Sequence, residues 1–200
     1  MTKTNSTAAF LAAMKKDRAQ LAKRSDELRA EIEQATQERA DAACDMITHG
    51  GPQNRGEAYS SLEEYDSALE DLDKAIELDP KDYDSFISRG NVYSYQKDYK
   101  RSIIDYTEAI DLNDENATGF AYRGDSYYRS KDYTKALKDL NQAIEIRPKW
   151  AYPWNARGNV YFDKKDYKKA VVDYTMAIEL RPEYGLYYSS RGDAYKQLGD

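Results

Sequence analysis

The chain has 200 residues, of which 33% are charged and 40% apolar, and its formal net charge is -6. This acidic balance argues against general binding to nucleic acids or anionic membranes, because both rest on clustered Lys and Arg. The single cysteine, Cys44, excludes an internal disulfide and fits a reducing compartment, so we expect a cytoplasmic protein. No apolar run approaches the roughly 18 residues of a membrane-spanning helix.

Residues 1–48 differ in composition from the rest, because all 19 tyrosines lie after residue 50. A helix-breaking cluster at 48–52 marks the boundary. Before it, apolar or small residues fit an alternating spacing of three and four, which lines one face of a helix or a coiled-coil seam. These residues are Leu11, Met14, Leu21, Leu28, Ile32, Ala35, Ala42 and Met46. We therefore predict a separate amphipathic helical segment at 1–48.

Several arrangements of this segment stay open. The helix can lie on a neighbouring surface, where it can occlude a binding groove, or fold as a hairpin. It can also form a coiled coil with a second copy through residues 8–47, which would make the chain a homo-oligomer, or it can be a disordered tail. The abrupt change in composition also fits an unrelated segment fused to a fragment of a repeat protein.

After the boundary, an Arg-Gly pair recurs every 34 residues. The pairs are Arg55-Gly56, Arg89-Gly90, Arg123-Gly124, Arg157-Gly158 and Arg191-Gly192. A strict period of this length is typical of stacked helix-turn-helix units. We therefore place a repeat domain at 49–200, with units at 49–82, 83–116, 117–150 and 151–184 and a terminal helix at 185–200.

Each unit repeats the same pattern of packing residues. The glycine lies in the middle of the first helix, where it normally costs about 1 kcal/mol relative to alanine, so we expect the second helix to approach it closely. In the second helix, small and large residues follow one another at a spacing of three or four, as interdigitating helices require. The small residues are Ala68, Ser102, Ala136 and Ala170, and the large ones are Leu72, Tyr106, Leu140 and Tyr174.

With its aromatic, Gly, Tyr, Ala and Pro columns in register, the sequence resembles the tetratricopeptide repeat (TPR) family over about 150 residues. The resemblance implies an all-α fold, a right-handed superhelical solenoid of helix-turn-helix units. Two departures matter. Pro52 stands where the first unit should have its aromatic residue, so we expect that unit's first helix to be short or distorted. The last unit stops after one helix, which is either a terminal cap or the end of a truncated array.

The arginine beside each glycine is unusual, because the family more often has an apolar residue there. Aspartates recur at the same period in the second helix, at Asp71, Asp105, Asp139 and Asp173. We predict that each arginine buries its aliphatic stem and pairs with one of these aspartates, in its own or the adjacent unit. The alternative is a row of guanidinium groups that binds a carboxylate or phosphate of a ligand.

The resemblance also implies a binding surface, because the first helices of TPR proteins line a concave groove in which partner peptides lie. Asn and Tyr side chains suit such a surface, since Asn both donates and accepts and Tyr offers a broad ring with a polar tip. The positions that correspond are Asn91, Tyr95, Tyr122, Asp125, Tyr128, Arg129, Tyr152, Asn155, Asn159 and Phe162.

Some family members hold the C-terminal carboxylate of a partner with a clamp of Lys, Asn and Arg. This chain keeps asparagines at two matching columns, Asn91 and Asn159, but has neutral residues in the basic columns, so the clamp is incomplete. With Asp125 and Asp163 nearby, we expect a protein or peptide partner that is neutral to basic.

The sequence gives little support for catalysis. His49 is the only histidine and lies five residues after Cys44, but no orienting or oxyanion-binding group is near them in sequence. No phosphate-binding glycine loop, zinc-binding cysteine pair or calcium-binding loop occurs. We therefore predict a non-enzymatic adaptor without metal or cofactor, which binds a peptide or helix in its groove. The alternative is a structural module that oligomerises through the N-terminal helix.

Overall fold

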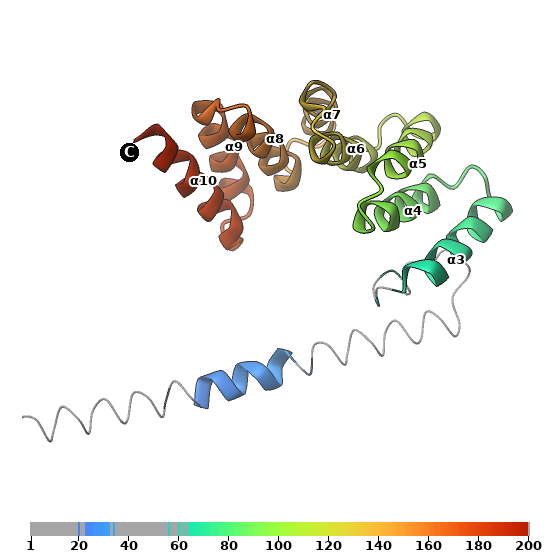
Figure 1. The fold of residues 1–200 in the computed structure, drawn as a ribbon, viewed down its shortest axis with the longest axis horizontal. Coiled ribbons are helices and arrows are strands. Elements are labelled where there is room, and N and C mark those ends of the chain that lie inside the picture. Colours follow the sequence, from blue (N-terminus) through green and yellow to red (C-terminus); the bar gives the residue numbers. More distant parts are fainter. Residues whose placement is uncertain are drawn as a thin grey trace, which may run out of the picture.

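The structure is a computed structural model that describes residues 20, 23–32, 34, 56, 60, 62 and 64–199. Residues 23–32 are helical and all of their side chains are exposed. From Tyr65 onward, eight helices of 13 or 14 residues follow one another, and the pairs stack side by side along the chain (Figure 1). They are α3 (Tyr65–Leu78), α4 (Tyr83–Tyr95), α5 (Tyr99–Leu112), α6 (Ala117–Arg129), α7 (Tyr133–Ile146), α8 (Ala151–Asp163), α9 (Tyr167–Leu180) and α10 (Gly185–Leu198).

The predicted all-α solenoid of helix-turn-helix units is confirmed. The ranges 83–116, 117–150 and 151–184 each contain one antiparallel pair, namely α4 with α5, α6 with α7 and α8 with α9. Of the first unit, α3 is described together with Gly56, Ser60 and Leu62, so the expectation of a short helix after Pro52 lies outside the described residues. The same holds for Cys44, His49 and most of the N-terminal seam.

A repeated turn starts each second helix of the three complete pairs. Lys97, Lys131 and Lys165 adopt left-handed backbone angles, with φ between 62° and 65°, and thereby reverse the chain. The aspartate that follows each lysine, Asp98 in the first of these turns, accepts a hydrogen bond from the backbone N–H three residues later at 3.1–3.3 Å. These aspartates cap the helices, because the first N–H groups of a helix have no partner within it.

The glycine of each unit lies against the large residue of the second helix. A Cβ atom placed on Gly90 would lie 2.6 Å from the ring of Tyr106, and one on Gly158 would lie 2.6 Å from the ring of Tyr174. Both rings are at least 98% buried. The expected close approach is confirmed. Burying the tyrosine stabilises the fold by roughly 2–3 kcal/mol, which exceeds the cost of about 1 kcal/mol for a glycine in a helix.

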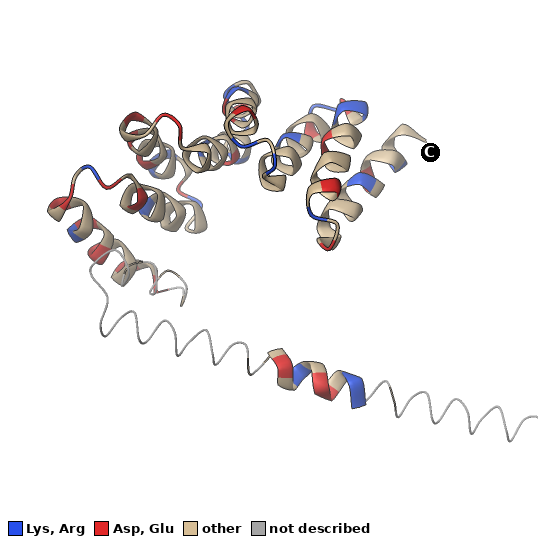
Figure 2. Cartoon of the chain, turned by 180° about the vertical axis from the view of Figure 1, so that it is seen from behind, with Lys and Arg blue, Asp and Glu red and all other residues tan. Residues whose placement is uncertain are grey.

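The core of the described helices is a series of small clusters, each of which joins side chains of two or more neighbouring helices. One cluster joins Phe86 and Ile87 of α4 to Tyr106 and Ala109 of α5. Another joins Ala136 and Leu140 of α7 to side chains of α8, and so links two units. Along the described helices, both acidic and basic residues occur at many positions (Figure 2). The faces that the clusters leave uncovered determine where a partner can bind.

The glycine column predicts opposite effects of one substitution at two positions. Gly158→Ala should destabilise the protein by about 1–3 kcal/mol, because the added methyl group overlaps the buried ring of Tyr174. Gly192→Ala should stabilise it by up to about 1 kcal/mol, because no atom lies within 4 Å of the new methyl group and alanine favours the helix. Thermal unfolding followed by circular dichroism measures both. Shifts of the same sign would contradict this account of the glycine column.

Candidate functional site

Three of the repeated arginines form bidentate ion pairs with aspartates of the second helices. Arg89, Arg123 and Arg157 each donate from Nε and Nη2 to the two carboxylate oxygens of the aspartate 16 residues later, at 2.7–3.1 Å. The partners are Asp105, Asp139 and Asp173. These carboxylates are only 3–5% exposed and the arginine side chains 16–20% exposed. The predicted pairing is confirmed, within each unit, for these three arginines.

Each of the same guanidinium groups also bonds to the preceding unit. Nη1 of Arg89 donates to Asp73 at 2.6 Å, and Nη1 of Arg123 donates to Thr107 at 3.1 Å. Nη1 of Arg157 donates to Asn141 at 2.6 Å. The arginines therefore join the second helices of successive units and do not form a row that is free to bind a ligand. Arg55 lies outside the described residues.

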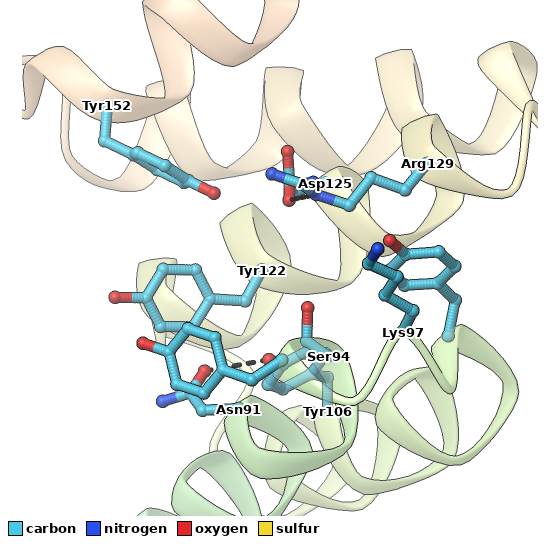
Figure 3. A pocket seen from close by; sticks show the side chains of 10 residues that line it. Asn91, Ser94, Lys97, Tyr106, Tyr122, Asp125, Arg129 and Tyr152 are labelled. Atoms are coloured by element: carbon cyan, nitrogen blue, oxygen red, sulfur yellow. Dashed lines mark hydrogen bonds and ion pairs between the residues drawn. The ribbon is translucent and has the colours of Figure 1, made fainter. Parts of the chain in front are cut away.

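A pocket of ≈ 370 Å³ opens between α4, α5, α6 and α8 (Figure 3). Its lining residues are Asn91, Ser94, Tyr95, Lys97, Tyr99, Tyr106, Tyr122, Asp125, Arg129 and Tyr152. Six of them belong to the ten positions that we assign to the groove. The first helices of three successive units thus bring Asn91, Tyr95, Tyr122, Asp125, Arg129 and Tyr152 around one space.

Tyrosines make up half of the residues that line the pocket. The ring of Tyr122 lies 5.9 Å from that of Tyr106 and 5.6 Å from that of Tyr152, centroid to centroid. Tyr95 is 63% exposed and stands at the rim. Burial raises the pKa values of Tyr106, Tyr122 and Tyr152, so these hydroxyl groups stay neutral and can both donate and accept.

The polar groups of the pocket are mostly donors. Nε of Arg129 donates to Asp125 at 2.6 Å, and hydrogen bonding to this carboxylate raises the pKa of Arg129. The hydroxyl group of Tyr106 donates to Oδ1 of Asn91 at 2.8 Å. Because that bond uses the carbonyl oxygen of Asn91, its NH2 group remains to donate. Hydroxyl, amide and cationic donors around a single paired carboxylate suit a ligand rich in carbonyl oxygens.

The other four predicted positions do not line this pocket. Asn159 accepts a hydrogen bond from the hydroxyl group of Tyr174 at 2.9 Å, and Phe162 packs against Tyr167 with centroids 5.3 Å apart. Tyr128 packs against Tyr133, and burial with nearby Asp163 raises the pKa of Tyr128 to about 12.

The fourth, Asn155, is 8% exposed, and its Oδ1 accepts no hydrogen bond from the described part of the chain. Because that oxygen is buried, a ligand does not reach it in this conformation.

Four lining residues lie outside our sequence prediction: Ser94, Lys97, Tyr99 and Tyr106. Lys97 and Tyr99 belong to the turn and the second helix, whereas we expected the first helices alone to form the groove. The spacing of Tyr106 predicts a packing residue, which is correct for its ring, whereas its hydroxyl group lies at the pocket and donates to Asn91. One signal in the sequence points to it: tyrosines at 106 and 174 accompany asparagines at 91 and 159, whereas Leu140 accompanies Asp125.

Comparison with known families settles what the repeat is. Profiles described as tetratricopeptide repeat match residues 53–82, 83–116 and 151–184, and one described as TPR repeat matches 124–164. The chain belongs to the tetratricopeptide repeat family. TPR domains are typical of protein–protein interaction scaffolds. A search of curated protein sequences gives no significant match.

Solved structures support the TPR fold. MamA shares 22% identity with this chain at a TM-score of 0.65, over 72% of this chain and 84% of that one. The first TPR of Spaghetti (RPAP3), bound to the HSP90 peptide SRMEEVD, shares 24% identity at a TM-score of 0.57, over 59% and 94%. The Sgt2 TPR domain from Aspergillus fumigatus shares 26% identity at a TM-score of 0.57, over 58% and 79%. Among the described residues, no helix is long and apolar enough to cross a membrane.

A double-mutant cycle tests the arginine–aspartate pair. Arg123→Leu should destabilise the protein by about 3–5 kcal/mol, because it leaves the buried carboxylate of Asp139 without its cation. Arg123→Leu with Asp139→Leu should recover most of that loss, because no charge then stays buried. Chemical denaturation measures these two variants together with Asp139→Leu, the second single variant of the cycle. A double variant no more stable than Arg123→Leu would show that the pair does more than neutralise a buried charge.

The buried tyrosines predict a delayed alkaline titration. An unfolded tyrosine ionises near pH 10, and burial raises the folded-state pKa of Tyr106, Tyr122, Tyr128 and Tyr152. Their stabilising effect is therefore complete below pH ~10 and is lost as the pH rises through the folded-state values. Absorbance at 295 nm should increase in two phases, the second together with loss of helical circular dichroism. Complete ionisation near pH 10 with the helices intact would contradict this.

Proposed function

We propose that this chain is a non-catalytic scaffold that binds a peptide or helix in the groove formed by its first helices. The observation that carries the proposal is the pocket of ≈ 370 Å³, whose walls come from three successive units. A binding site shared among units suits an extended ligand, because such a ligand contacts each unit in turn. The TPR of RPAP3, which shares the fold, is bound to a peptide.

The chemistry of the pocket favours a peptide backbone as the ligand. Half-buried donors at Asn91, Ser94 and the hydroxyl groups of Tyr122 and Tyr152 line the pocket and can bind backbone carbonyl oxygens. The tyrosine rings supply broad apolar contact that loses little conformational entropy. Side chains of the partner would pack against these rings.

The overall charge favours a neutral to basic partner. Residues 1–50 carry eight basic and eight acidic residues, so the net charge of -6 belongs wholly to residues 51–200, where 22 basic residues face 28 acidic ones. An acidic surface attracts basic segments and repels acidic ones during encounter. Within the pocket, Arg129 and Asp125 pair with each other, so this preference rests on the net charge of residues 51–200.

Oligomerisation through residues 8–47 stays a second candidate function. Leu28 and Ile32 lie four residues apart in the described helical run 23–32 and are 43% and 65% exposed. Two exposed apolar side chains on one helix face are what a coiled-coil seam offers to a second copy.

A peptide library displayed on phage, selected on the full immobilised chain, tests the groove. We expect neutral to basic peptides that bind the variant Tyr95→Ala/Arg129→Gln at least 10-fold more weakly, which is about 1.4 kcal/mol. Tyr95 is 63% exposed, and the glutamine amide introduced by Arg129→Gln would still donate to Asp125, so folding should not change.

The matched control for this test is Ile104→Ala/Val172→Ala, which removes two exposed apolar side chains from second helices. It should bind the selected peptides within two-fold of the unaltered chain. Peptides that bind the pocket variant and the control equally well would place the binding surface elsewhere.

A further inference from the structure

Three turns of the solenoid carry a lysine in a backbone conformation that lysine disfavours. Lys97, Lys131 and Lys165 have φ between 62° and 65°, the left-handed region in which a Cβ atom lies too close to the backbone. In the next unit the same position is Gly199, with φ 86°. Its N–H group donates to the carbonyl oxygen three residues earlier, as that of each lysine does. The turn therefore accepts glycine, which adopts these angles without strain.

Backbone strain that recurs at one position points to a function for the residue that bears it. All three lysine side chains are exposed, and none pairs with a carboxylate in the described part of the chain. The aspartate that follows each lysine pairs instead with a basic residue of the second helix at 2.7–3.1 Å, namely Arg101, Lys135 or Lys169. The three lysines thus add exposed positive charge at positions where glycine would fold more easily.

Contacts between the turns place these lysines along one edge of the array. Lys97 lines the same pocket as Arg129, the last residue of α6, so the first two turns adjoin. The hydroxyl group of Tyr133 donates to Asp163, the last residue of α8, at 3.5 Å, which joins the second turn to the third. We call Lys97, Lys131 and Lys165 the lysine rim.

Basic residues gather at this edge of the array and not at the opposite one. Seven-residue windows that begin at the last residue of a first helix hold ten basic and four acidic residues in total, and are 95–101, 129–135 and 163–169. Windows that begin at the last residue of a second helix hold four basic and six acidic residues, and are 78–84, 112–118, 146–152 and 180–186. The edge with the lysine rim therefore has a net charge of +6.

The rest of the domain has the opposite charge, which restricts the kind of ligand that suits the rim. Residues 51–200 carry 22 basic and 28 acidic residues, so those outside the three rim windows number 12 basic and 24 acidic, a net charge of -12. A nucleic acid would bring its dense charge close to these acidic residues and be repelled. A few carboxylates can contact the rim alone.

The spacing of the rim suits an extended chain. First helices of successive units are in contact, and packed helices lie roughly 8–10 Å apart. Three residues of an extended peptide span about 10 Å, so carboxylates at every third residue match lysines one unit apart. A lysine ammonium group is a point charge on a flexible stem, and so it pairs with a carboxylate without a fixed geometry.

We propose that the lysine rim binds an extended acidic segment of a partner protein, whose carboxylates pair with the lysines of successive units. Residues 1–50 hold equal numbers of acidic and basic residues and so do not supply such a segment. Lys131 and Lys165 do not line the pocket, so the proposal goes beyond groove binding and does not depend on it.

The test uses a labelled peptide with glutamate at every third residue and serine elsewhere, and fluorescence anisotropy with the full chain. Binding should be saturable at an ionic strength of about 0.01 M, where screening is weak, and should decrease as salt is added. A peptide with glutamine in place of glutamate should bind at least 10-fold more weakly.

Matched variants of the protein locate the binding. Lys131→Gln/Lys165→Gln leaves the pocket intact and should bind the glutamate peptide at least 10-fold more weakly. The control Lys138→Gln/Lys149→Gln removes two exposed lysines outside the rim and gives the same net charge, and it should bind within two-fold of the unaltered chain.

A glycine variant tests the strain argument together with the binding. Lys131→Gly/Lys165→Gly should also bind at least 10-fold more weakly, but its thermal midpoint should rise, because glycine adopts the left-handed angles without strain. Loss of binding by a more stable protein cannot come from unfolding. A lower midpoint would show that the lysines are retained for the fold, and would overturn the proposal.

Four further outcomes would overturn it. The first is equal binding of the glutamine peptide, and the second is equal weakening in the rim and control variants, which would indicate general charge attraction. The third is tighter binding of single-stranded DNA than of the glutamate peptide. The fourth is salt-sensitive self-association of the full chain, measured by light scattering, that the rim variant abolishes. In that case a second copy, and not a partner's acidic segment, covers the lysine rim.

Discussion

The close approach of two helices at a glycine is the constraint on which the rest of this structure depends. Gly90 and Gly158 admit a tyrosine ring that any side chain at those positions would displace. The arginine beside each glycine then reaches the aspartate beside the ring, so that one contact is apolar and its neighbour ionic. The arginine and the glycine are adjacent in the first helix, and the aspartate and the tyrosine are adjacent in the second. The two contacts together therefore determine how the first helix is rotated about its axis relative to the second.

That rotation determines which residues face the pocket. With Arg and Gly turned toward the second helix, the residue after glycine turns toward the groove, where Asn91 and Asp125 line the pocket. The packing residue also acts there, since the hydroxyl group of Tyr106 bonds to Asn91. In the unit with Leu140 no such hydroxyl group exists, and Asp125 pairs with Arg129 instead. A buried packing residue therefore also supplies a polar group to the pocket. Units with Tyr and units with Leu at this packing position alternate along the chain.

The sequence predicts the packing far better than the pocket, for a physical reason. The two helices of every unit pack in the same way, so the residue types found at Arg123, Gly124 and Asp139 recur at a constant period of 34 residues that can be read from the sequence. The pocket arises between units and from a turn, and its residues differ from one unit to the next. Lys97 could not be assigned to it from spacing, because its place depends on the left-handed turn that brings it there.

Contacts in the described solenoid run between neighbouring helices and between first helices of successive units. No segment of the described helices ties one end of the array to the other. In an array built in this way, small rotations at the interfaces between helices add up along its length and change its curvature. The curvature of the described array is thus shared by its glycine contacts, and a change of curvature strains each of them slightly without needing a hinge.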